Sequence, residues 1–181
     1  DIIVINNESQ TITQECTDYL NEINNMVTPF GEIKVIHREN KGGSLGAYSH
    51  AFDIFIDDYD YWLFVEDDLK LIYPNYYQMI IDEFKDEKLG FLALTLINNE
   101  NNINTKHVSG GFGASKTTIL KKIKEKYGKL PYDEGNNLTN YGGFGQSEMY
   151  FTNCYHTIGY DVRIPNNNEV ITLADNWVDF P

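Results

Sequence analysis

Three consecutive carboxylates, Glu66, Asp67 and Asp68, directly follow the most apolar run in the chain, residues 61–65 (Tyr-Trp-Leu-Phe-Val). Like charges repel, so such a trio at the end of a buried strand lowers stability unless a cation or hydrogen-bond donors compensate. Carboxylate oxygens bind hard divalent cations, and substrate phosphates often complete the coordination. The trio therefore predicts a cation site. The alternative is an acidic turn that caps the following helix.

A second candidate is the glycine-rich segment of residues 40–48 (Asn-Lys-Gly-Gly-Ser-Leu-Gly-Ala-Tyr), between a predicted strand and a predicted helix. Glycines allow the backbone to approach a ligand closely, and the N-terminus of a helix favours negative charge. The spacing matches neither a Walker loop nor G-x-G-x-x-G, so it does not favour dinucleotide binding. The alternative is a turn that glycine needs for close helix packing.

Glu148 is the third candidate, because it follows a glycine-rich segment at the start of a predicted helix. A carboxylate in this place can act as a general base if its pKa suits the working pH. The alternative is a favourable interaction between its charge and the helix dipole.

The elements that must position these residues follow from the apolar pattern. Apolar runs alternate with segments whose apolar residues recur every three or four positions, which is typical of a sheet flanked by helices. Strands are expected at residues 2–5, 33–36, 61–65, 90–97, 161–164 and 170–173. Helices are expected at residues 11–27, 44–56 (with Ser44 as N-cap), 74–84, 117–127 and 147–158. The strand at 61–65 would be central and buried on both faces. Residues 128–146 would form a long loop, and its glycines at 142–145 would close over a ligand.

Composition and charge limit the class of protein. The 181 residues, of which 41% are hydrophobic, can bury one core, so a single domain over residues 1–181 is expected. Acidic residues outnumber basic ones 27 to 14, and the electric field of this negative charge repels nucleic acid, so no nucleic-acid partner is expected.

No run approaches the roughly 18 apolar residues of a transmembrane segment, and the first residues lack the basic flank of a signal peptide. The 2 cysteines show no metal or disulfide spacing. They fit a reducing compartment, hence a cytoplasmic protein, either free or peripheral at a membrane.

Taken in order, these motifs resemble GT-A fold glycosyltransferases, particularly the inverting family 2 in the form of galactofuranosyl- and rhamnosyltransferases. Residues 63–69 look like the strand and DxD turn of that family, and residues 40–48 look like its Asn-x-Gly-Gly segment. Residues 147–162 are similar to its Glu-Asp…Gly-Tyr helix, and residues 108–112 resemble the turn beside the acceptor and the transferred sugar.

The resemblance implies an α/β, Rossmann-like GT-A fold with a mixed, mostly parallel sheet flanked by helices. It implies a metal-dependent transferase that moves a sugar from a nucleoside-diphosphate donor to a hydroxyl acceptor (a glycan, a lipid-linked acceptor or another), with inversion. The cofactor would be Mn²⁺ or Mg²⁺, held by Asp68, Glu66 and Asp179. Glu148 would be the catalytic base, and Trp177 would contact the acceptor. The nucleotide-sugar contacts would come from Asn6, Asn7, Ser9, Arg38, Asn40, Gly42, Gly43, Glu66, Asp67, Gly110 and Gly111.

The chain departs from the family in three places. It has Glu66-Asp67-Asp68 for Asp-x-Asp and Ser147-Glu148 for Glu-Asp, and residues 175–181 match the region where relatives carry a metal-binding histidine, with Asp179 as the candidate substitute. Residues 6–9 (Asn-Asn-Glu-Ser) resemble the nucleobase turn, which normally follows the second strand of the family. Either a strand is missing upstream and the domain is trimmed, or a later strand–helix unit is absent.

Other classes of protein stay open at this point. A retaining transferase shares the core and the metal. A sugar nucleotidyltransferase should carry an N-terminal glycine-rich loop with arginine, which the sequence lacks. A degenerate transferase that binds nucleotide or glycan without turnover would also explain the departures.

Overall fold

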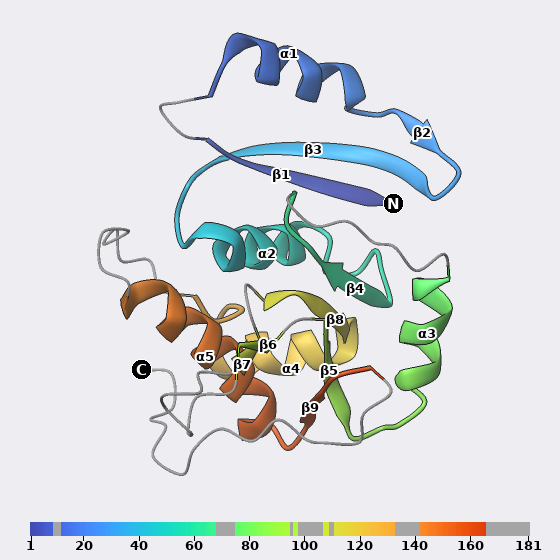
Figure 1. Ribbon diagram of the computed structural model, residues 1–181, viewed down its shortest axis with the longest axis vertical. Helices are drawn as coiled ribbons and strands as arrows, with labels where there is room; N and C mark the ends of the chain where they lie inside the picture. The colour runs from blue at the N-terminus through green and yellow to red at the C-terminus, as the bar shows by residue number, and fades with distance from the viewer. Residues whose placement is uncertain are drawn as a thin grey trace.

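The computed structural model of this protein describes residues 1–8, 12–67, 75–94, 96–97, 107–108, 111–132 and 142–165. Helices and strands are interspersed within these ranges (Figure 1), so the mixed α/β class predicted from the apolar pattern is confirmed. The strand expected at residues 170–173 lies outside the described residues. Within the described ranges, no helix combines the length and the apolar character needed to cross a bilayer.

The first part of the chain forms a three-stranded unit, here called the N-terminal sheet. Strand β1 (Ile2–Glu8) pairs in parallel with β3 (Gly31–Glu39), and the short β2 (Val27–Thr28) adds to β3 as a hairpin. Helix α1 (Gln14–Ile23) connects β1 to β2, and the Thr13 hydroxyl caps it by accepting from the Cys16 amide. The parallel register brings the carboxyl ends of β1 and β3 to the same edge.

The rest of the chain builds a four-stranded unit, here called the main sheet, in the order β4–β8–β5–β9. The strands are β4 (Tyr61–Phe64), β8 (Gly113–Lys116), β5 (Leu89–Ala93) and β9 (Asp161–Arg163). Its helices are α2 (Gly43–Ile54), α3 (Tyr76–Glu83), α4 (Thr117–Tyr127) and α5 (Gly142–Thr157). A separate pair, β6 (Leu96–Ile97) with β7 (His107–Val108), is antiparallel.

The expectation of a mostly parallel sheet is wrong for the described pairings. β8 lies between β4 and β5 and runs antiparallel to both, so β4, β5 and β9 share one direction while only β5 and β9 are paired in parallel. β8 was not predicted because its sequence, Gly-Ala-Ser-Lys, has no apolar alternation. A Cβ at Gly113 would overlap the Leu92 carbonyl oxygen and the Phe91 ring, so this place between two strands requires a glycine.

The hydrophobic core lies around the main sheet. All residues of β5 are buried, and α2, α4 and α5 pack side chains such as Phe52, Leu120 and Tyr155 against this sheet. In contrast, the side chains of β1 and β3 are half-buried or exposed, and Leu20 is the one buried hydrophobic residue in the described chain before α2. The two sheets therefore differ greatly in how much apolar surface they bury.

Among the described strands, β4 lies at the edge of the main sheet, which corrects the prediction of a central strand buried on both faces. Trp62 and Phe64 point into the core, whereas Tyr61 is 40% exposed on the other face. The run of residues looks continuous in the sequence because its outward side chains are apolar too.

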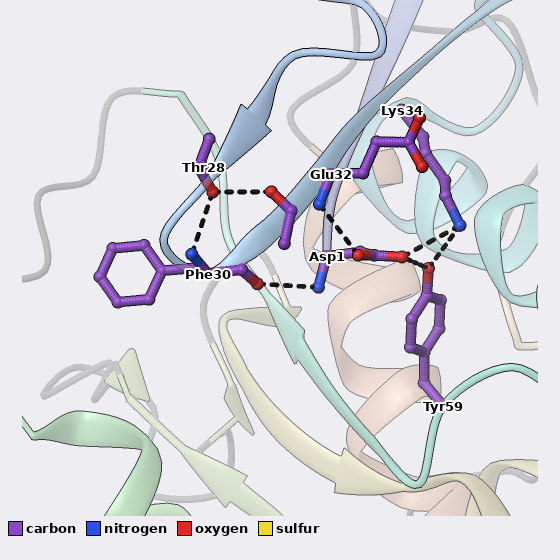
Figure 2. Close-up of polar contacts among 7 residues, drawn as sticks. Asp1, Thr28, Phe30, Glu32, Lys34 and Tyr59 are labelled. Atoms are coloured by element: carbon purple, nitrogen blue, oxygen red, sulfur yellow. Dashed lines mark hydrogen bonds and ion pairs between the residues drawn. The ribbon is translucent and has the colours of Figure 1, made fainter.

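A polar cluster ties the N-terminal sheet to the segment before β4 (Figure 2). The Asp1 carboxylate accepts from the Tyr59 hydroxyl (2.6 Å) and the Glu32 amide (3.0 Å), and forms an ion pair with Lys34 (3.0 Å). The Lys34 ammonium donates to the Tyr59 hydroxyl (3.0 Å), and this hydrogen bond raises the pKa of Lys34. The cluster lies at the start of β1, opposite the edge where β1 ends.

Candidate functional site

The carboxyl ends of β1, β3 and β4 meet the first turn of α2, and polar residues gather there. We call this place the polar edge and define it by Asn7, Arg38, Glu66, Asp67 and the turn of residues 42–44. Ligands of open α/β sheets bind beyond the carboxyl ends of strands. The glycine-rich turn and the acidic residues, which lie far apart in the sequence, are therefore close together at the end of the sheet where ligands of α/β proteins bind.

Arg38 links the end of β1 to the turn before α2. Its Nη1 donates to Asn7 Oδ1 (2.7 Å), and its Nη2 donates to the Lys41 carbonyl oxygen (2.9 Å). The other amide atom of Asn7, Nδ2, donates to the Gly43 carbonyl oxygen (3.1 Å). Both amide atoms of Asn7 are thus engaged within the protein, so Asn7 shapes the edge and its capacity to read a ligand is limited.

Ser44 connects the glycine-rich turn to the acidic trio, because its hydroxyl donates to a carboxylate oxygen of Glu66. The prediction of Ser44 as N-cap is wrong. The N-cap is Gly42, with a left-handed backbone (φ +75°) and no side-chain cap, so α2 begins one residue before Ser44. This places the Ser44 hydroxyl in the first turn of the helix, where it can reach β4. The sequence did not mark Ser44 as a site residue, since serine is common at helix starts.

The acidic trio offers oxygen ligands of the kind that hard cations prefer. Glu66 is half-buried and has a second carboxylate oxygen beyond the one that Ser44 contacts, while Asp67 is exposed. Asp68 lies outside the described residues. No group of three or more His, Cys, Asp or Glu side chains converges within the described part of the chain. Mg²⁺ is commonly held by one or two carboxylates together with substrate phosphates, and the described donors fit that kind of site.

Glu148 and Glu66 both lie toward the end of the main sheet where β4 ends. Phe151 of α5 packs edge-on against Phe64, the last residue of β4, with ring centroids 6.3 Å apart. Glu66 lies beyond Phe64 along β4. Glu148 lies about one helical turn before Phe151. Tyr155 lies close to Gly90 near the start of β5, whereas Phe151, one turn earlier in α5, contacts the end of β4, so α5 runs opposite to both strands. Both carboxylates are thus displaced toward one edge, and Figure 1 shows the first turns of α2 and α5 on the same side of the molecule.

Helix α5 also corrects the predicted loop. Residues 142–146 are helical, so the glycines at 142–145 belong to the start of α5, and the prediction that they form a closing loop is wrong. Glycine has poor helix propensity, which is why the sequence pattern places the helix start after them.

Gly111 approaches the first turn of α2 closely. A Cβ at this position would lie 2.5 Å from Leu45 Cδ2 and 3.3 Å from the Tyr48 ring. Its backbone is left-handed (φ +70°). Gly113, two residues later, pairs with Phe64, so Gly111 lies at the end of the main sheet where β4 ends.

Other predicted residues lie outside this network. Asn6 points to the face opposite Asn7 and forms a 3.0 Å hydrogen bond with His37. Asn40 is exposed beside the turn. Ser9, Asp68, Gly110, Trp177 and Asp179 lie outside the described residues.

A hollow of about 370 Å³ lies away from the polar edge, where β5 and β9 begin, and is lined by residues that include Asp86, Lys122 and Tyr160. Asp86 is bound by Arg163 (2.5 Å), and Lys122 donates to the Tyr160 hydroxyl (2.6 Å). Hydrogen bonds from the Lys88 backbone amide and from Arg163 lower the pKa of Asp86. The Asp86–Arg163 pair links the turn before β5 to β9, and the Lys122–Tyr160 hydrogen bond links α4 to the residue before β9.

No protein-family model and no curated protein matches this chain. Its function therefore has to be inferred from the chemistry of the residues at the polar edge.

Replacing Gly42 with alanine is expected to lower the free energy of unfolding more than the same change at Gly128. Both have left-handed backbones (φ +75° and +79°), which costs an L-residue about 1–2 kcal/mol. A Cβ at Gly42 would also overlap the Tyr132 ring, whereas nothing lies within 4 Å of a Cβ at Gly128. Overpacking should add about 1–3 kcal/mol at Gly42 alone. Urea unfolding of both variants measures this difference, and equal losses would contradict the contact.

Proposed function

We propose that this protein is a glycosyltransferase that moves a sugar from a nucleoside-diphosphate donor to a hydroxyl acceptor, with Mn²⁺ or Mg²⁺ and with inversion. The observation that supports it most is the hydrogen bond between Ser44 and Glu66. It joins the two motifs that a donor diphosphate and its cation would need, the glycine-rich turn and the acidic trio. The resemblance of both motifs to GT-A transferases gives the same direction.

The donor would lie along the polar edge. The Arg38 guanidinium supplies positive charge beside the turn of residues 42–44, in a chain whose net charge is −13. Local positive charge of this kind favours a diphosphate where the protein as a whole repels anions. Asp67 would bind the ribose.

A divalent cation would be held by Glu66 and Asp68. When bound, it would supply positive charge that stabilises the departing nucleoside diphosphate. The Ser44 hydroxyl donates to one oxygen of Glu66, so a residue of the protein itself orients this carboxylate.

Glu148 would act as the general base. It takes the proton from the acceptor hydroxyl as that oxygen forms a bond to the anomeric carbon, while the bond from this carbon to the diphosphate oxygen breaks. Attack and departure on opposite faces of the sugar invert its configuration. The common placement of Glu148 and Glu66 toward one edge supports this division of roles.

Calorimetry with UDP, GDP and dTDP, each with and without Mn²⁺, tests the proposal. One of these should bind with a Kd on the order of micromolar to millimolar, and EDTA should abolish the binding. Incubation with the corresponding nucleotide sugars should then release the diphosphate, and NMR of the product reports the anomeric configuration. Retention would favour a retaining transferase, and binding without any turnover would favour a non-catalytic module. No binding of any nucleotide with metal would refute the proposal.

A further inference from the structure

Tyr132, which no sequence motif marked, packs directly on the turn that carries the polar edge. A Cβ at Gly42 would overlap Cδ2 of the Tyr132 ring and would lie 2.8 Å from Cε2 and 3.0 Å from Cγ. The ring therefore occupies the space that any side chain at position 42 would need. This contact joins the segment after α4 to the start of α2.

The turn has little conformational preference of its own. Gly42 and Gly43 both adopt left-handed backbones (φ +75° and +56°). Glycine populates many backbone conformations when unfolded and loses more freedom than other residues on folding. A turn of two consecutive glycines therefore depends on contacts from outside to hold one conformation.

Three hydrogen bonds of the site depend on the conformation of this turn. The Gly42 carbonyl oxygen accepts from the Gly46 amide (2.9 Å), which starts α2. The Gly43 carbonyl oxygen accepts from Asn7, and Ser44 donates to Glu66. A shift of the backbone at Gly42 would thus move the position at which Glu66 is held.

The Tyr132 ring also has contacts besides the one with the Gly42 turn. It is half-buried against the hydrophobic core, and Leu130, two residues earlier, is 1% exposed. The Lys129 ammonium lies over the Tyr132 ring, 4.0 Å from its centroid. Packing against the core and the contact with Lys129 therefore restrict the movement of the Tyr132 ring.

We propose that Tyr132 is a positioning residue for the donor site: its ring holds the Gly42–Gly43 turn and, through Ser44, orients Glu66. The proposal rests on the proposed function for its ligand, but the contact itself can be tested without one. The hydroxyl of Tyr132 has no part in this role, so phenylalanine should replace it.

The test compares Tyr132→Leu, Tyr132→Phe and a matched control, Tyr127→Leu. Tyr127 is another half-buried tyrosine against the core, with Lys126 over its ring (5.2 Å), and it is the last residue of α4; the three atoms nearest to a Cβ at Gly42 all belong to Tyr132. With the Mn²⁺–nucleoside diphosphate that the wild type binds best, Tyr132→Leu should lower the affinity about tenfold or more. Tyr132→Phe and Tyr127→Leu should stay within about twofold of the wild type. Where a nucleotide sugar turns over, the loss should appear in KM for the donor.

Hydrogen exchange of the Gly46 amide gives a second readout that needs no ligand, because this amide donates to Gly42. Its exchange should be faster in Tyr132→Leu and unchanged in the other two variants. If the wild type binds no nucleotide, the proposed function fails while this exchange still decides the positioning role. Equal exchange in Tyr132→Leu and Tyr127→Leu would overturn the proposal, as would an affinity loss in Tyr132→Phe as large as in Tyr132→Leu.

Discussion

Replacing Glu148 with glutamine should lower the rate of sugar transfer by about 10²–10⁴-fold while nucleotide binding stays intact. Glutamine keeps the size of the side chain but cannot take the proton of the acceptor hydroxyl. Glu148 lies in α5, one turn before the Phe151 ring that packs on β4, so the change leaves the core contacts of the helix in place. Turnover of the nucleotide sugar and calorimetry with Mn²⁺ and the nucleoside diphosphate measure the two effects separately.

Glu125→Gln is the matched control for this variant. Glu125 is exposed on α4, so its replacement removes the same charge from a surface away from the polar edge. A Glu148→Gln variant that retains the rate of the control would show that Glu148 is not the base. A variant that loses nucleotide binding together with the rate would assign Glu148 to binding.

Glu66→Gln should reduce the metal-dependent affinity for the nucleoside diphosphate by about 10–100-fold. The amide oxygen of glutamine can still accept the Ser44 hydroxyl, so the link to α2 is preserved and the negative charge alone is removed. Affinity measured against Mn²⁺ concentration reports the change. The thermal midpoint without ligand should be close to that of the wild type.

Ser44→Ala provides the complementary variant, because it keeps the charge of Glu66 and removes its hydrogen-bond donor. Its loss of affinity should be smaller than that of Glu66→Gln, because losing the negative charge of Glu66 weakens cation binding more than losing the hydrogen bond that orients this charge. If Glu66→Gln binds the metal–nucleotide complex as tightly as the wild type, Glu66 does not contribute to a cation site.

The elements that local patterns specify were predictable from the sequence. Helix α4 spans Thr117–Tyr127 as predicted, because its apolar residues recur at helical spacing and Gly128 ends it in a left-handed conformation. Strands β1 and β3 were found at their apolar centres, but their ends extend into polar residues such as Asn7 and Arg38. Backbone pairing between the two parallel strands continues beyond their apolar residues, so the strands are longer than the apolar pattern predicts.

Features that depend on tertiary contacts could not be predicted. β8 exists because small residues fit between β4 and β5, and nothing in the Gly-Ala-Ser-Lys segment itself favours a strand. The acidic trio and the glycine-rich turn were identified separately, but their link through Ser44 depends on how β4 lies against α2. Tyr132 was missed for the same reason, since a single tyrosine in a predicted loop carries no local signal.

The N-terminal sheet has a consequence for the energetics of ligand binding. It pairs with no strand of the main sheet among the described residues, and Leu20 of α1 is the one buried hydrophobic side chain in the described chain before α2. We expect such a unit to open sub-globally at a lower free-energy cost than the core around β5. A ligand that spans Asn7 and Glu66 would have to immobilise it, so part of the intrinsic binding energy would be spent as conformational entropy. Engineered contacts that stiffen β1 against the main sheet should therefore tighten binding without touching the ligand.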